Sequence, residues 1–239
     1  MLTMFLFVLM VSIGYLLGSV CSAVIVSKIF NLPDPRIQGS QNPGATNVLR
    51  LSGKKYALMV LLADILKGLL PVLLAKLLGA GIIVESFTGL AAVLGHMYPA
   101  FFHFKGGKGV ATALGVLLAL NLILGVLVIA TWLLVANFAR YSSLASIVSI
   151  VFAPFYSLFI FGNLNAFPPL LLIALFVLYK HRNNITRLTD GTEPKINFRK
   201  KMATDFTDTP LAEESIELLA DEEVEDADAG INPTEIEKK

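Results

Sequence analysis

A glycine-rich segment around Lys108 is the strongest candidate for chemistry in this sequence. Gly106, Gly107 and Gly109 surround the lysine, and a helical pattern follows over residues 110–120. Glycine lets the backbone approach a ligand closely, and a helix start presents unpaired N–H groups with the positive end of the dipole. The segment therefore predicts an anion site, most often one for phosphate. The alternative is a flexible membrane-surface turn whose lysines mark the cytoplasmic side.

A second polar segment, Gly39–Asn47, reads GSQNPGATN and is dense in hydrogen-bonding side chains. Ser40, Asn42 and Asn47 can bond to hydroxyl groups and phosphate oxygens. Arg50 follows at the start of a helical pattern, and its planar guanidinium suits bidentate phosphate binding. The letters NPG would by themselves form an ordinary turn, but a turn leaves the surrounding polar cluster unexplained.

The third candidate is HRNN at residues 181–184. His181 and Asn184 lie three apart and share one face of a helix. His181 at a helix end can orient a hydroxyl or act as a base near neutral pH, or it can belong to a basic interfacial anchor. His96 lies on an apolar face and is expected to bond to a neighbouring helix. No histidines or carboxylates have metal-ligand spacing, so no metal site is expected.

Membrane helices must position these candidates. Of the 239 residues, 55% are hydrophobic and 15% are charged, and the mean hydropathy is +0.71. Soluble domains carry about 25% charged residues. We therefore expect an all-α, polytopic membrane protein surrounded by lipid, with no nucleic-acid partner.

The apolar runs cover residues 1–29, 58–78, 82–104, 110–139, 147–161 and 167–179. The run 110–139 is too long for one span and has Asn121 and Gly125 in its middle, so we divide it there into two short helices. Seven transmembrane helices result. The positive-inside rule then places the N-terminus outside and the C-terminus inside, and the three polar segments meet at the cytoplasmic face.

Two patterns within the runs predict helix contacts. Asp64 and Lys67 lie one helical turn apart, which favours a mutually paired couple facing the bundle interior. Gly14, Gly18 and Ser22 recur at a spacing of four, which lets another helix approach closely.

Charge divides the chain into two parts. Residues 1–201 hold 17 Lys/Arg and 5 Asp/Glu, a net charge of 17 − 5 = +12. Residues 202–239 hold 2 Lys/Arg and 13 Asp/Glu, a net charge of 2 − 13 = −11. The basic membrane part, 1–201, suits an anionic lipid or a phosphorylated substrate. The acidic part, 202–239, is predicted to be a disordered cytoplasmic tail.

Four segments, GSQNPGATNVLR, GHMYPAFFHFKGGKGVAT, RYSSLASI and HRNNITRL, occur in the order seen in one family. They resemble the bacterial acyl-phosphate:glycerol-3-phosphate acyltransferases (PlsY), over about Gly14 to Lys195. Gln41 stands where that family usually has glycine. The resemblance implies a seven-helix bundle in the bacterial plasma (inner) membrane with its active site at the cytoplasmic face.

The reaction implied by the resemblance is acyl transfer from acyl phosphate to the 1-hydroxyl of sn-glycerol 3-phosphate. The products are 1-acylglycerol 3-phosphate (lysophosphatidic acid) and phosphate, in the first step of phospholipid biosynthesis. The resemblance implies no cofactor, and the enzyme that forms acyl phosphate is a candidate partner.

The family's substrate-site positions carry over to individual residues of this chain. They fall on Ser40, Asn42, Arg50, Gly106, Gly107, Lys108, Gly109, His181 and Asn184. We assign catalytic roles to Lys108, His181 and Arg50, and we add Asn47 as a substrate contact. Lys108 and the loop amides would bind one phosphate, and Arg50 with Ser40 another.

His181 and Asn184 would orient the glycerol backbone. The base is either His181 or a phosphate oxygen of a substrate. We expect the acyl chain to lie between helices, in room left by the stripe of Gly14, Gly18 and Ser22.

A transporter of an organic phosphate is the alternative function, since it would also need a basic phosphate site. A transporter predicts polar residues through the full membrane depth and an internal repeat, and the sequence shows neither. A structural scaffold would leave the density of motifs unexplained.

Overall fold

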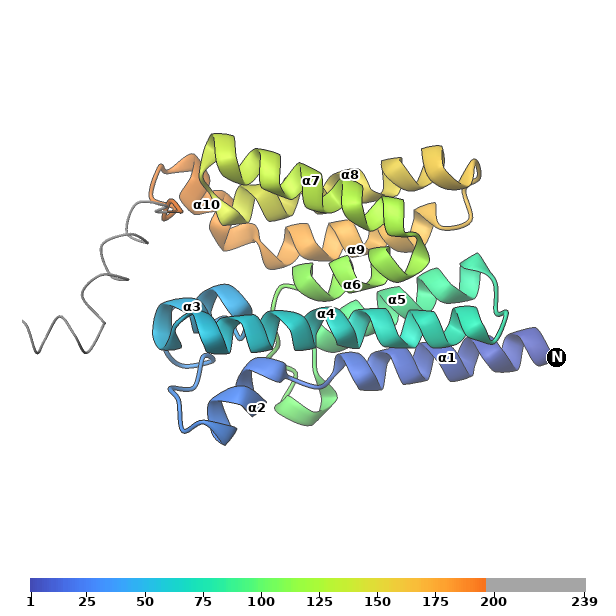
Figure 1. The fold of residues 1–239 in the computed structure, drawn as a ribbon, viewed down its shortest axis with the longest axis horizontal. Coiled ribbons are helices and arrows are strands. Elements are labelled where there is room, and N and C mark those ends of the chain that lie inside the picture. The colour runs from blue at the N-terminus through green and yellow to red at the C-terminus, as the bar shows by residue number, and fades with distance from the viewer. Residues whose placement is uncertain (197–239) are drawn as a thin grey trace, which may run out of the picture. The chain divides into compact units, whose positions relative to one another are not determined.

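The computed structural model describes residues 1–196, and within them all regular structure is helical (Figure 1). The expected all-α fold is confirmed for this part of the chain. In chain order the elements are α1 (Leu2–Gly18), α2 (Ser22–Ile29), α3 (Ala45–Ser52), α4 (Lys54–Leu77), α5 (Ile82–Met97), the 3-10 helix η1 (Ala100–Phe102), α6 (Val110–Leu120), α7 (Leu122–Ala139), α8 (Ser142–Phe161), α9 (Phe167–Lys180) and α10 (Arg182–Thr189).

Four helical segments are long and apolar enough to cross a membrane. They are Thr3–Ile29, Lys54–Leu77, Leu122–Ala139 and Ser142–Phe161. The apolar helices α6 and α9 are shorter, and at 1.5 Å per residue the 11 residues of α6 extend about 17 Å. A helix occupies each predicted run, and the count of seven membrane crossings stays a prediction.

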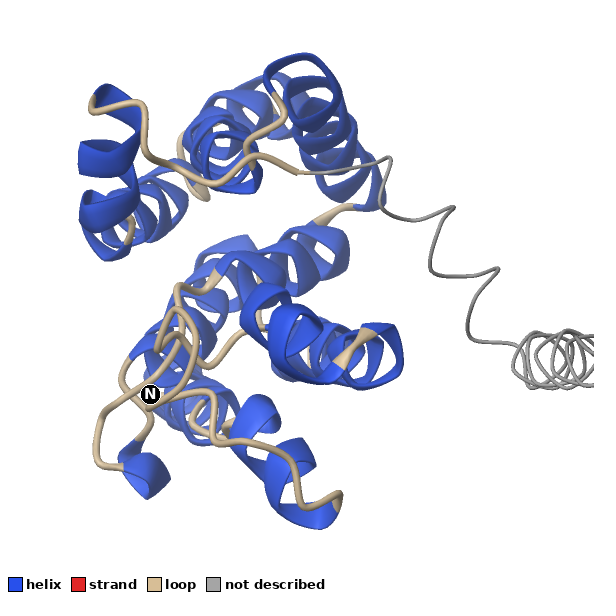
Figure 2. Cartoon of the chain, turned by 90° about the vertical axis from the view of Figure 1, so that its left-hand side faces the viewer, coloured by secondary structure: helices blue, strands red, loops and turns tan. Residues whose placement is uncertain are grey.

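The helices form one compact unit that extends from Met1 to Lys195. In Figure 1, α3 and α10 lie at one end of the helices, and the start of α1 lies at the other end with the turn after α4. Figure 2 shows the helices from the end that carries α3 and α10. The predicted boundary at residues 201 and 202 and the acidic tail lie outside the described residues.

The main hydrophobic core joins α5, α6, α8 and α9. Its largest fully buried side chains include Met97, Leu117, Leu120, Ile150 and Leu170. Because α5 and α6 flank the glycine loop and α9 leads to His181, this core fixes the glycine loop and His181 relative to one another.

The break in the long apolar run falls where the sequence predicts it. Asn121 has extended backbone geometry, and its side-chain oxygen accepts hydrogen bonds from the N–H groups of Ile123 (2.9 Å) and Leu124 (3.3 Å). Asn121 is therefore the N-cap of α7. Gly125 lies in the first turn of that helix, where a Cβ atom would come within 2.4 Å of the Leu118 side chain.

Three predicted boundaries are wrong. The first run is two helices rather than one, with a break at Ser19–Cys21. The run 82–104 is helical only to Met97, because Pro99 forces the preceding residue, Tyr98, out of helical geometry (φ −135°, ψ 67°). Helix α8 begins at Ser142, five residues earlier than predicted, directly after a left-handed turn at Arg140 (φ 64°).

Two of the three residues of the small-residue stripe, Gly14 and Gly18, lie on α1 and pack directly on α5, whereas Ser22 lies beyond the break, at the start of α2. A Cβ atom on Gly14 would lie 2.5 Å from the Thr88 carbonyl oxygen, and one on Gly18 would lie 2.1 Å from the Ala92 carbonyl oxygen. The predicted close approach of another helix is confirmed. The expectation that this stripe leaves room for an acyl chain is wrong, because the backbone of α5 fills the space.

Candidate active site

The glycine loop connects the end of α5 to the start of α6. Gly109 is the N-cap of α6 and has a left-handed φ of 84°, a conformation that favours glycine. Helix α6 begins at Val110, as the sequence predicts. Its first-turn amides have no partner within the helix and are directed back toward the loop.

The loop is packed tightly on the end of α5. A Cβ atom on Gly106 would lie 2.0 Å from the His96 carbonyl oxygen, and one on Gly107 would lie 2.2 Å from His96 Nε2. The Gly107 N–H also donates to the His96 carbonyl oxygen at 3.2 Å. The Gly107 amide is thus engaged, so the other loop amides and the first turn of α6 are the candidate anion donors.

Lys108 joins the glycine loop to the HRNN segment. Its ammonium donates to the side-chain oxygen of Asn184, at the start of α10. Burial lowers the pKa of Lys108 to about 8; the Glu193 carboxylate opposes this shift, and the positive charges of Arg187 and Arg50 add to it. Lys108 therefore stays mainly protonated at neutral pH.

His181 lies between α9 and α10 and is only 3% exposed. Its Nδ1 is 2.8 Å from the Val177 carbonyl oxygen. A carbonyl oxygen only accepts, so Nδ1 carries the proton and Nε2 keeps a free lone pair. Burial, with the charge of Lys108 next in effect, lowers the pKa of His181 to about 4. At neutral pH the ring is uncharged, so Nε2 can accept a hydrogen bond from a hydroxyl group, and the lowered pKa makes the ring a weaker base than an ordinary histidine.

Glu193 completes this cluster, and sequence reasoning missed it. Its Oε1 accepts from Asn184 Nδ2 at 2.7 Å, and its Oε2 accepts from Arg187 Nε at 2.7 Å. The first bond fixes the Asn184 amide so that its oxygen faces Lys108. The Asp190-Gly191 pair, a turn signal, marks the reversal that returns the chain to α10.

The first polar loop is shaped by Asn47. Its Oδ1 accepts from the Ser40 N–H at 2.9 Å, and its Nδ2 donates to the Pro35 and Gln38 carbonyl oxygens, each at 3.0 Å. These bonds give Asn47 a structural role, and its substrate contact stays a prediction. Gln41 has a left-handed φ of 56°, which accounts for the glycine usual at that position in the resembling family.

Arg50 lies in the last turn of α3 and not at the start of a helix. Its side chain is exposed, and its charge acts on the pKa of Lys108. Ser40 is exposed and Asn42 is half-buried, and within residues 1–196 neither hydrogen-bonds to Lys108. The structure therefore brings Lys108, Asn184 and His181 together with Arg50 in electrostatic reach, and the contacts of Ser40 and Asn42 stay predictions.

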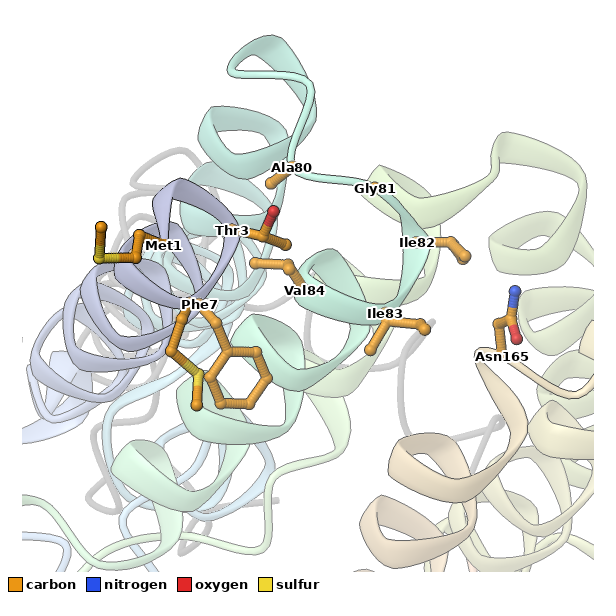
Figure 3. Close-up of a pocket in the computed structure, with 10 residues that line it drawn as sticks. Met1, Thr3, Phe7, Ala80, Gly81, Ile82, Ile83, Val84 and Asn165 are labelled. Atoms are coloured by element: carbon orange, nitrogen blue, oxygen red, sulfur yellow. The ribbon is translucent and has the colours of Figure 1, made fainter.

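A pocket of about 560 Å³ lies elsewhere, beside the start of α1 and the turn between α4 and α5 (Figure 3). Its lining is mainly apolar, with side chains such as Phe7 and Ile83. The pocket adjoins the first residues of α5, whereas the glycine loop packs on the last residues of that helix. The 16 residues of α5 separate the two ends by about 24 Å. The pocket is therefore separate from the candidate site.

Among residues 1–196, no three His, Cys, Asp or Glu side chains are grouped to hold a metal ion.

Comparison with solved structures finds two related crystal structures of PlsY, an integral membrane glycerol 3-phosphate acyltransferase. Its glycerol 3-phosphate form is 42% identical, covers 82% of this chain and 98% of that one, and has a TM-score of 0.77. Its lysophosphatidic acid form is 43% identical, covers 80% of this chain and 95% of that one, and has a TM-score of 0.73.

Sequence comparisons find relatives with the same enzyme name as the solved structures. A glycerol-3-phosphate acyltransferase from Legionella pneumophila (strain Corby) is 58% identical over 97% of this chain and 83% of its own length. The enzyme of the same name from Coxiella burnetii (strain Dugway 5J108-111) is 50% identical over 80% of this chain and 98% of its own length. The glycerol-3-phosphate acyltransferase family model matches residues 8–191. These matches favour an enzyme over the transporter alternative, and the chain belongs to the glycerol-3-phosphate acyltransferase family.

Proposed function

We propose that this acyltransferase uses acyl phosphate as its donor and the 1-hydroxyl of sn-glycerol 3-phosphate as its acceptor. The products are 1-acylglycerol 3-phosphate and inorganic phosphate. The observation that carries the proposal is the cluster in which Lys108, at a helix start, bonds to Asn184 beside the buried, neutral His181. An anion site thus lies next to a group that can accept a proton.

The chemistry follows from the activated donor. The glycerol hydroxyl oxygen attacks the acyl carbonyl carbon, the bond from that carbon to the phosphate oxygen breaks, and phosphate leaves with the electron pair. The hydroxyl proton passes to His181 Nε2 or to a phosphate oxygen. Because the mixed anhydride is already reactive, positioning and charge stabilisation are enough, and a protein nucleophile is not needed.

We propose the residue roles from the charges around the site together with the family resemblance. Lys108 and the amides at the start of α6 would stabilise the leaving phosphate. Arg50, with Ser40, would bind the phosphate of glycerol 3-phosphate. Asn184 and His181 would orient the glycerol hydroxyl.

We further propose seven membrane crossings in the bacterial inner membrane, with the N-terminus outside and the C-terminus inside. The position of α3 and α10 at one end of the helices (Figure 1) supports a single catalytic face. At this cytoplasmic face, the enzyme that forms acyl phosphate is the candidate partner. Cys21 is the single cysteine of the sequence, so single cysteines added to a Cys21→Ser chain would report sidedness. Labelling of the exposed positions 55 and 190 from the outside of intact cells would contradict the topology.

The donor can be tested with the purified protein in lipid, supplied with palmitoyl phosphate and glycerol 3-phosphate and without coenzyme A. We expect lysophosphatidic acid and phosphate to appear in equal amounts. Product from palmitoyl coenzyme A, with none from palmitoyl phosphate, would overturn the donor assignment.

The pH dependence of kcat/KM gives an independent prediction. The protonated form of Lys108 is the one that binds phosphate, and its pKa is lowered to about 8. We therefore expect kcat/KM to fall as pH rises through about 8, because this parameter reports the free enzyme. Initial rates between pH about 6 and 10 would show this alkaline limb. A Lys108→Arg variant with residual activity should lose the limb, and an unchanged limb would contradict the assignment.

A further inference from the structure

A buried group of ionisable side chains lies between α4 and α5 and has no part in the chemistry above. Asp64 and Lys67 belong to α4 and His96 to α5, and each is less than a tenth exposed. Lys67 Nζ is 2.8 Å from Asp64 Oδ1, which confirms the pair predicted from the sequence. His96 Nδ1 faces the same oxygen at 3.5 Å, so His96 meets the neighbouring helix, but without the regular hydrogen bond that the sequence predicts.

The cluster also reaches the break between α1 and α2. Lys67 Nζ donates to the Val20 carbonyl oxygen at 2.7 Å. The ammonium thus stabilises a carbonyl that the interrupted helix leaves without its usual partner. The cluster therefore connects the first apolar run, α4 and α5.

His96 connects the cluster to the glycine loop. Its carbonyl oxygen accepts from Gly107 N–H, and its Nε2 atom occupies the space that a Gly107 side chain would need. The other edge of the same ring, at Nδ1, faces Asp64. A change in the orientation of this ring therefore changes what supports Gly107, next to Lys108.

The ion pair itself gives little reason to expect a gain in stability. A buried ion pair is weak evidence for stability, because the cost of desolvation offsets much of the Coulomb attraction. Ionisable side chains inside membrane helices are costly and often functional. In addition, Asp64 Oδ1 and His96 Nδ1 form no hydrogen bond of regular geometry with any group in residues 1–196.

We propose that Asp64, Lys67 and His96 form a positioning unit that holds Gly106 and Gly107 in the conformation needed for phosphate to bind beside Lys108. Asp64 attracts Nδ1 of the imidazole, Lys67 balances the charge of Asp64, and the far side of the ring supports the loop. These are positioning residues, since they act through the loop. The inference rests on the proposed function only in taking the loop as a phosphate site.

The test compares Asp64→Asn with a matched control, Glu85→Gln. Glu85 is also a buried carboxylate, but it lies in the first turn of α5, at the opposite end of that helix. The affinity for inorganic phosphate would be measured by calorimetry on the full chain in lipid, together with the KM values for acyl phosphate and glycerol 3-phosphate. We expect Asp64→Asn to weaken phosphate binding and raise the acyl-phosphate KM about tenfold, with a much smaller change in kcat. Glu85→Gln should bind phosphate as the native protein does.

A second variant separates ring support from helix stability. His96→Asn keeps a short amide donor toward Asp64 and removes the ring edge that supports Gly107, so it should weaken phosphate binding to a similar degree. If Asp64→Asn does not fold, the phosphate affinity and KM values of His96→Asn test the proposal. A merely structural role would reduce the amount of folded protein and leave phosphate affinity and KM unchanged, and that result overturns the proposal.

Calorimetry also keeps this inference distinct from the donor assignment. If the native chain makes no product from acyl phosphate but binds phosphate, and the variants bind it more weakly, the donor assignment fails and the positioning unit stands. If the native chain does not bind phosphate, the positioning unit fails.

Discussion

Replacement of Lys108 by methionine is expected to lower kcat/KM for acyl phosphate about 10³-fold, because the cation proposed to stabilise the leaving phosphate is lost. Methionine keeps much of the length of lysine and lacks the charge. It also removes the bond to Asn184 that joins α10 to the glycine loop. Initial rates of phosphate release and of lysophosphatidic acid formation, measured together, would show the loss.

Lys105→Met is the matched control for this experiment. Lys105 lies three residues earlier in the same loop and is exposed. Its removal changes the net charge of the face by the same amount. We expect kcat/KM for acyl phosphate to fall about twofold or less, because an exposed charge is screened by solvent and salt. Equal losses in the two variants would indicate a general charge effect and not a specific phosphate contact. An active Lys108→Met enzyme would remove Lys108 from the mechanism.

Features set by nearby residues could be predicted from the sequence. The start of α6 follows from Gly109, since a left-handed residue before an apolar helical run acts locally. The division at Asn121 follows from the capping side chain, which reaches only two and three residues ahead. The pair of Asp64 and Lys67 follows from their spacing on one helix.

Features set by contacts between distant segments could not be predicted. The support of Gly107 by His96 depends on how the loop folds back on α5. The stripe of Gly14 and Gly18 indicates a close contact, but its spacing does not say that the backbone of α5 fills the space. The sequence also predicts Arg50 at the start of a helix, whereas it lies in the last turn of α3, where a cation meets the negative end of the helix dipole.

Glu193 is the clearest case of a residue that only the folded chain reveals. The segment in which it lies is predominantly basic and holds two carboxylates, Asp190 and Glu193, and nothing in the sequence singles out Glu193. In the structure it is buried, and it bonds to Asn184 and Arg187. Because Asn184 in turn bonds to Lys108, Glu193 fixes the direction of an amide in the candidate site.

Glu193→Gln is expected to lower kcat/KM about 10- to 100-fold, the loss that follows when one charge-assisted hydrogen bond is replaced by an unpaired donor. Glutamine offers one acceptor and one donor group where the carboxylate offers two acceptors. If its oxygen faces Asn184, its NH₂ group opposes the Nε–H of Arg187. If its oxygen faces Arg187, the Asn184 amide must reverse and turn its own NH₂ group toward the ammonium of Lys108.

A second substitution tests this account of Glu193. In Glu193→Gln/Arg187→Met the opposing donor is gone, so the glutamine oxygen can accept from Asn184, and we expect most of the lost kcat/KM to return. Asp190→Asn, the same change at an exposed carboxylate just after α10, should behave as the native enzyme. Steady-state rates on folded protein would measure all three variants. A double variant no better than Glu193→Gln would show that the charge of Glu193 itself, and not the direction of the Asn184 amide, supports the site.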